Sequence, residues 1–478
     1  MIERTPNFKL IKKMNNKVFL RRMLWLLCLP LLLTACKDSM DEHYEVPDWV
    51  ADNAWEVLSS GEHGNYSIFL QGLEIAGYKQ MLEGKAILTI IAPDDDAFQT
   101  YLNKRGFTSI SDMPVNEVSK LIGYHVLYYS YNKEKLVNFR PTGSTETEEE
   151  QNIKAGLYYK HRTRSSDAPT VETTPTGASV MVYHLERYLP IFSYRYFQTK
   201  GIDAKNNYEA FYPNSTWTGD DGFNVSNASV KEYGIIANNG YIHAVDRVVE
   251  PLETIYTELK NKEKYSTFLD LYDSFGVYVA DDELSKSYAK AYGVDTLYQY
   301  QHGGLPNIAC EWPTSSYLNF TALTALSYSI FAPSNTAINS FFDSFWKIGG
   351  YSSMQEVDAL ALNYFLYQFI YGGSMLFPEE LGDDELKNLA GSSLNINPAA
   401  LNEKTMCVNG ALYGMDEIKE PSTFASVIGP LFQYKSARSF LYALLGSSLF
   451  SSYVSDLSKY IVLVPTACLL YTSDAADD

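Results

Sequence analysis

The residues of this chain that could do chemistry are a few histidines, many carboxylates and an unusual number of tyrosines. The sequence holds 7 His, 57 Asp or Glu and 38 Tyr. Carboxylates are so numerous that chance pairs of them carry no information. No two His or Cys residues stand at metal-ligand spacing, and no phosphate-binding glycine loop or Gly-x-Ser-x-Gly elbow occurs. The sequence therefore predicts no enzyme, no metal ion and no cofactor.

Two histidines lie inside recurring apolar segments. His125 follows Tyr124 in the segment 121–126, and His243 lies in the segment 239–246. A catalytic His needs a nucleophile and an orienting acid, which neither segment supplies. We therefore interpret both as core residues that donate a hydrogen bond, with a ligand or catalytic role as the alternative.

Three consecutive aspartates, residues 94–96, follow the apolar run 88–93. An EF-hand calcium loop would alternate its ligands and end in Glu, and this segment does neither. Pro93 instead ends a strand, and Asp94 or Asp95 caps a helix that ends near Gly106.

The strand, proline turn and helix recur along the chain. The unit of residues 88–98 returns at 328–338 and begins again at 460–466. The first two copies each reach an Asn-Gly turn followed by a strand, at Asn239 and at Asn409. Such self-similarity organises the whole fold.

The ordered motifs resemble those of the fasciclin domain family. An Ala-Pro-Asp turn, the Tyr124-His125 pair and Asn-Gly-x-x-His-x-x-Asp at 239–246 match in the first copy, whereas the second has Gln368 and Leu412 at its histidine positions. The resemblance implies an α+β fold of tandem domains, each a small β-sandwich wedge flanked by helices. It also implies adhesion through Tyr124, His125 and the turn around Asp94. The implied domains are residues 46–251, 252–421 and a truncated third, 422–466.

Two insertions interrupt this pattern. The first domain carries about 73 extra residues, roughly 140–220, and the second carries a smaller insert at about 275–320. The first insert holds an aromatic cluster, and exposed Tyr and Trp rings suit stacking on sugars or proteins. The candidate binding surface comprises Tyr194, Tyr196, Tyr212 and Trp217. The alternative is that these rings pack the insert onto the domain.

The amino terminus predicts export and lipidation. Seven basic residues precede the apolar run 23–33, which is shorter than the ~20 residues of a membrane-spanning helix. Residues 33–36 resemble a lipobox, in which Cys36 receives diacylglycerol after removal of a signal peptide, residues 1–35. Residues 36–45 then form a tether. Lys37-Asp38 resembles the surface-export tag of Bacteroidetes lipoproteins, which implies an outer membrane lipoprotein exposed on the cell surface.

Charge and cysteine usage limit the partners. Removing residues 1–35 changes the formal net charge from −19 to about −25, because they hold seven basic residues and one acidic residue. Nucleic acid is therefore excluded as a partner. Cys310 and Cys407 are predicted to be buried free thiols, with a disulfide as the alternative.

The last twelve residues, 467–478, resemble translated sequencing-adaptor read-through. We expect the natural protein to continue through a complete third domain. The sequence as a whole predicts a non-enzymatic adhesion or interaction lipoprotein whose ligand outside the cell is a protein or a glycan. The alternative is a glycan-capture accessory protein of a polysaccharide-uptake system.

Overall fold

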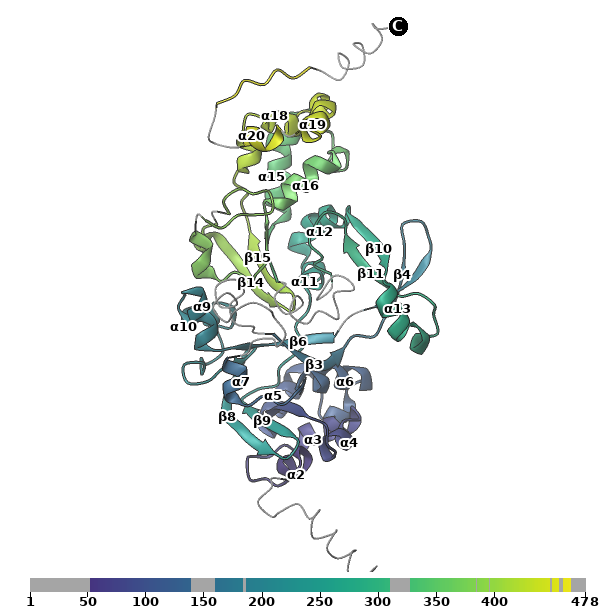
Figure 1. The fold of residues 1–478 in the computed structure, drawn as a ribbon, viewed down its shortest axis with the longest axis vertical. Coiled ribbons are helices and arrows are strands. Elements are labelled where there is room, and N and C mark those ends of the chain that lie inside the picture. Colours follow the sequence, from purple (N-terminus) through teal and green to yellow (C-terminus); the bar gives the residue numbers. More distant parts are fainter. Residues whose placement is uncertain are drawn as a thin grey trace, which may run out of the picture. The chain divides into compact units, whose positions relative to one another are not determined.

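The computed structural model describes residues 52–138, 160–183, 186–309, 327–383, 385–394, 396–447, 449–454 and 459–465. Cys36, the tether, the acidic run 145–150, Cys310 and the tail after Pro465 lie outside these residues. Residues 52–478 form one unit, distinct from residues 1–51. The fold is mixed α+β, as predicted (Figure 1).

The first predicted domain is built on a sheet that closes on itself. Its order is β1-β2-β3-β6-β7-β8-β9, and the parallel pairing of β1 with β9 completes the ring. The strands are β1 (Leu88–Pro93), β2 (Val126–Tyr128), β3 (Lys160–Ser166), β6 (Glu186–Phe192), β7 (Asn224–Val225), β8 (Ala228–Ala237) and β9 (Gly240–Val245). Strands β3 and β6 come from the predicted insert, so part of it belongs to the body of the domain.

Helices cover this sheet, and the aspartates after Pro93 position two of them. The helices are α2 (Ala54–Ser59), α3 (Ser67–Ile75), α4 (Lys79–Glu83), α5 (Asp95–Arg105), α6 (Val115–Tyr124) and α7 (Lys133–Val137). Asp94 caps α5 by accepting from the Ala97 amide at 2.9 Å, and Gly106 ends it with a φ of 79°. Asp95 instead accepts from the Ile68 amide of α3 at 2.8 Å. The prediction of a helix cap is thus confirmed, with Asp94 in that role.

The second predicted domain repeats the central strand pair in the same register. Its sheet, β13-β12-β15-β14, contains β12 (Tyr328–Pro333), β13 (Ile370–Gly372), β14 (Leu401–Cys407) and β15 (Gly410–Met415). Tyr328 faces Gly410 and Pro333 faces Met415, just as Leu88 faces Gly240 and Pro93 faces Val245. The main helices beside it are α11 (Ile255–Lys260), α12 (Ser266–Asp273), α15 (Asn335–Phe341) and α16 (Ala359–Tyr367).

The Asn-Gly motif attaches the first helix of each domain to its sheet. The Asn239 side chain accepts from the Ala54 amide at 3.0 Å and donates to Leu82 O at 2.8 Å. The Asn409 side chain likewise accepts from the Ile255 amide at 2.9 Å and donates to Ile308 O at 2.9 Å. Repetition of the motif therefore reflects repetition of one buried hydrogen-bond arrangement.

The sheet register corrects one residue of the repeat. Ile91 N donates to His125 O, and Phe331 N donates to Phe369 O. The counterpart of His125 is therefore Phe369, and Gln368 replaces Tyr124. The ring of Phe69 lies 5.9 Å from His125, and that of Phe268 lies 6.1 Å from Phe369. The error arose because the second copy has a longer segment between Pro333 and the end of α16.

The described residues that follow β15 form helices and no further strand. The helices α17 (Ser422–Ala425), α18 (Gly429–Gln433), α19 (Arg438–Leu445) and α20 (Phe450–Val454) follow β15, and Phe424 and Phe432 join the core of the second domain. Residues 459–465 are not a strand, so that prediction is wrong. In both other copies this strand pairs with a neighbouring strand on each side.

Candidate functional site

Each of the two motif histidines of the first domain has a backbone partner within hydrogen-bond distance of both ring nitrogens. His125 Nδ1 lies 3.0 Å from Leu121 O, and its Nε2 accepts from the Val249 amide at 3.1 Å. His243 Nδ1 accepts from the Gly234 amide at 3.1 Å, and its Nε2 lies 3.0 Å from Tyr131 O. Both side chains are buried. The core role is confirmed, because neither ring has a nitrogen left for a ligand.

Burial lowers the pKa of His125 and that of His243 to about 4. An unfolded His has a pKa near 6.5, so the unfolded chain binds protons between pH 6.5 and 4 that the folded chain does not. Each His thus contributes stability above pH 6.5 that is lost as the pH falls toward 4. That loss amounts to roughly 3 kcal/mol per His at most.

We expect His125→Phe to flatten this pH dependence, because phenylalanine binds no proton and already occupies the matching place at Phe369. The variant also leaves the Val249 amide without its acceptor, which costs about 1–3 kcal/mol at neutral pH. Urea unfolding at several pH values between 7 and 4.5 measures both effects. A slope in the variant equal to that of the parent would contradict the assignment of proton uptake to His125.

The other residues predicted for adhesion also have structural roles. Tyr124 is buried, and its hydroxyl donates to Tyr188 O at 2.9 Å. Asp94 caps α5 and forms an ion pair with Lys231 of β8. No contact joins Asp94 to Tyr124 or His125 in the described part of the chain. These three residues therefore do not form one exposed site.

The predicted aromatic surface is a buried cluster, and this part of the prediction is wrong. Tyr194 and Tyr196 lie in α9 (Tyr194–Lys200), and Tyr212 and Trp217 follow α10 (Ala204–Phe211). Tyr196 and Trp217 are buried, Tyr212 is partly buried with its hydroxyl 3.1 Å from Ser226 Oγ, and only Tyr194 is exposed, at 40%. The rings pack against the second domain, where Phe377 lies 4.9 Å from Phe197. The rings pack inside because burying their apolar surface in a core is more favourable in free energy than leaving it exposed to water.

The two inserts meet in one four-stranded sheet, which the sequence did not predict. The first insert supplies β4 (Thr170–Thr173) and β5 (Ser179–Val182), and the second supplies β10 (Gly276–Ala280) and β11 (Tyr298–His302). The order is β10-β11-β5-β4, and Val182 pairs with Tyr298. Two separate insertions therefore build one element that neither could form alone.

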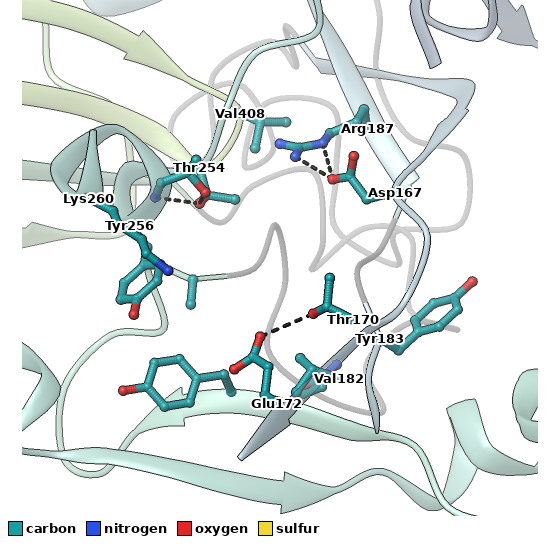
Figure 2. Close-up of a pocket in the computed structure, with 14 residues that line it drawn as sticks. Asp167, Thr170, Glu172, Val182, Tyr183, Arg187, Thr254, Tyr256, Lys260 and Val408 are labelled. Atoms are coloured by element: carbon teal, nitrogen blue, oxygen red, sulfur yellow. Dashed lines mark hydrogen bonds and ion pairs between the residues drawn. The ribbon is translucent and has the colours of Figure 1, made fainter. Parts of the chain in front are cut away.

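A pocket of about 260 Å³ lies beside this sheet (Figure 2). It is called the junction pocket below. Its lining comes from both inserts, from α11 with the preceding Thr254, and from Val408 between β14 and β15. The residues are Asp167, Thr170, Glu172, Val182, Tyr183, Arg187, Thr254, Tyr256, Thr257, Lys260, Gln299, Tyr300, Ala309 and Val408. A second hollow, of about 700 Å³, shares Asp167, Thr170 and Arg187 with it and extends to Lys120 and Arg164.

Ion pairs hold one wall of the junction pocket. Arg187 of β6 is buried, and its guanidinium bonds Asp167 and Glu253 while donating to Leu252 O at 2.7 Å. Lys120 lies 2.7 Å from Asp167 and 3.4 Å from Glu253. Burial alone would raise the pKa of Asp167, but Arg187 and Lys120 more than offset it and hold that pKa below its ordinary value. This network ties the linker at 252–253 to the first domain.

Tyr256, Tyr300 and Glu172 line the other wall, and Asp273 and Tyr278 bind these side chains from outside the lining. Asp273 accepts from Tyr300 at 2.9 Å and from Tyr256 at 3.2 Å, and Glu172 accepts from Tyr278 at 2.9 Å. Burial, with the charge of Asp273 as a second cause, raises the pKa of Tyr256 and of Tyr300 well above the ordinary value. Both phenols therefore stay neutral and donate to Asp273 at physiological pH.

A histidine lies behind this wall and does not line the pocket. His302 Nε2 lies 3.1 Å from Asp273 Oδ1, and the ring packs against Tyr272 and Tyr300. Its Nδ1 is enclosed and has no hydrogen-bond partner among the described residues. A general base must reach its substrate, and this nitrogen does not reach the pocket. The described residues also contain no group of three metal-ligating side chains.

Besides the ion pair of Asp167 with Arg187, the pocket offers aromatic faces, hydroxyl groups, the Glu172 carboxylate and the Lys260 ammonium. The ammonium of Lys260 has no ion-pair partner in the described part of the chain. This composition suits recognition of a neutral polar ligand such as a sugar. Sequence reasoning missed the pocket because its residues lie on separate segments between positions 167 and 408. The pocket could have been predicted only from the pairing of the two inserts in one sheet.

Comparison with known proteins gives the class of the first domain. The family model of the fasciclin domain matches residues 64–190, so the chain carries a fasciclin domain. A solved pair of FAS1 domains from the insect cell adhesion molecule fasciclin I is similar over 75% of this chain and 98% of its own length. That likeness has 12% identity and a TM-score of 0.25. No curated protein matches the chain.

Proposed function

We propose that this protein is a lipid-anchored, surface-exposed adhesion or interaction lipoprotein without catalytic activity. The observation that carries the proposal is that the motif residues of the fasciclin domain make structural contacts within the fold. The two inserts, which share one sheet, are therefore the candidate interaction surface of this chain. Fasciclin domains are associated with cell adhesion, and Cys36 after residues 33–35 supports the anchor.

The predicted partners follow from the same features. The diacylglycerol on Cys36 binds the outer membrane, and the ligand outside the cell is a protein or a glycan. Among the described residues, no helix has both the length and the apolar character needed to cross a bilayer.

Cys36→Ser tests the anchor in a Bacteroidetes host. We expect the parent chain in the membrane fraction and the variant outside it, because the hydroxyl cannot replace the thiol as acyl acceptor. Antibody against the inserts should label intact cells that carry the parent chain. Labelling that appears only after permeabilisation would refute surface exposure and weaken the adhesion proposal, while the anchor would stand.

Glycan capture is the second candidate function. Its candidate site is the junction pocket, because the aromatic cluster of the first insert is buried. We expect the parent chain to bind a neutral glycan on an array, and the double variant Glu172→Ala, Lys260→Ala to lose at least tenfold in affinity. The control removes the exposed pair Lys205 and Glu209, which lies on α10 away from the pocket lining. An array without signal for the parent chain would remove this candidate and leave adhesion to a protein.

A further inference from the structure

The second domain contains a cavity where the first domain has a core. Ile90 faces Val126 in the first domain, and Ile330 faces Ile370 in the second, so Gln368 takes the place of Tyr124. By the same pairing Met415 replaces Val245 and Leu401 replaces Val230. The three first-domain residues belong to one buried apolar cluster, whose other members include Leu189, Ile191, Phe223 and Val225.

The strands that complete this cluster have no counterpart in the second sheet. Leu189 and Ile191 come from β6 and Val225 from β7, and the order β13-β12-β15-β14 contains no equivalent of either. The space holds instead a cavity of about 590 Å³. Gln368, Met415 and Leu401 all line it. The cavity therefore occupies the position that side chains fill in the sister domain.

The floor of this cavity is apolar and carries two buried amides. Phe369, Leu394 and Leu401 are each less than 8% exposed. Asn388 Nδ2 donates to Gln368 Oε1 at 3.2 Å, and Gln368 Nε2 donates to Tyr364 O at 3.2 Å. Each amide nitrogen carries two hydrogens, so each keeps one N–H beyond these bonds. A ligand here meets apolar contacts and up to two hydrogen-bond donors.

Charged residues at the opening of the cavity influence which ligand charge is favoured. Asp416, Glu417, Lys419 and Glu420 line it and are exposed, so the cavity reaches solvent there. Lys264 pairs with Asp416 at 2.9 Å, which leaves the mouth with a small negative excess. An anion is disfavoured by this field.

We propose that this cavity binds an uncharged small molecule with an apolar body and a carbonyl or hydroxyl oxygen that accepts from Gln368 or Asn388. Its volume lies in the range of small-molecule sites. The site is separate from the junction pocket, so it stands or falls independently of the proposed function.

Nile red is a suitable probe, because it is uncharged, apolar and carries a carbonyl oxygen. Residues 52–478 form a unit apart from residues 1–51, so the chain beginning at Lys37 can be titrated without detergent. We expect one dye per chain with blue-shifted emission. Gln368→Tyr, which inserts the residue of the sister domain, and Leu394→Trp should each weaken binding at least tenfold.

Val182→Trp is the matched control, because it fills the junction pocket and should leave dye binding unchanged. Near-ultraviolet circular dichroism confirms that each variant is folded, and Gln368→Tyr keeps the test valid should Leu394→Trp fail to fold. The anionic dye anilinonaphthalene sulfonate should bind at least tenfold more weakly than Nile red. Absence of Nile red binding, or equal binding by folded Gln368→Tyr, would overturn the proposal.

Discussion

Gly240→Ala is expected to unfold the first domain. A Cβ at this position would lie 1.9 Å from Leu88 O, far inside any allowed contact. The obstacle is backbone of the adjacent parallel strand, so no side chain can move aside. Relief requires β1 and β9 to separate, and that pairing closes the sheet. We expect a loss of about 4 kcal/mol or more, measured by calorimetry and circular dichroism.

Gly106→Ala separates steric conflict from backbone strain. Gly106 also has a positive φ, 79°, but a Cβ there meets nothing within 4 Å. Its substitution should cost only about 1 kcal/mol. Gly410→Ala should behave like Gly240→Ala, since a Cβ there would lie 1.9 Å from Tyr328 O. Equal melting temperatures for Gly240→Ala and Gly106→Ala would contradict the argument.

The elements predicted well are those whose physics is local. The cap at Asp94, the end of α5 at Gly106 and the strand after Asn239 each depend on residues within a few positions. The free thiol at Cys407 was also predicted, and it is buried and unpaired in the structure. Local rules succeeded here because backbone preference and hydrogen bonding agree with the tertiary fold.

The incorrect predictions concern residues whose place depends on contacts with distant parts of the sequence. The sequence around Tyr196 does not distinguish an exposed ring from a buried one. Its contact with Phe377, 181 positions later, makes it part of the core. The segment 460–464 has the residues of a strand, yet a strand exists only beside a partner. The junction pocket likewise needs both inserts. Each of these facts depends on long-range contact, which a single sequence does not contain.

Phe377→Ala is expected to release the first insert from the second domain. Phe377 is fully buried, and its ring centroid lies 5.7 Å from Phe211 and 6.0 Å from Tyr196, besides the close contact with Phe197. Removal of a buried phenylalanine costs about 3–5 kcal/mol, because contacts are lost and a cavity remains. The loss should fall on α9 and α10, where Lys200 also pairs with Glu380 at 3.0 Å.

Hydrogen exchange resolves this effect by segment. In Phe377→Ala, amides of α9 and α10 should exchange faster by two orders of magnitude or more, since that free energy corresponds to such a factor. Amides of β1 and β9, which lie in the separate core of the first sheet, should keep their protection. Phe424→Ala is the matched control, because Phe424 is equally buried but contacts Phe345 and Phe432. If both variants exposed α9 and α10 equally, the insert would be held by the second domain as a whole, and Phe377 would not be its attachment point.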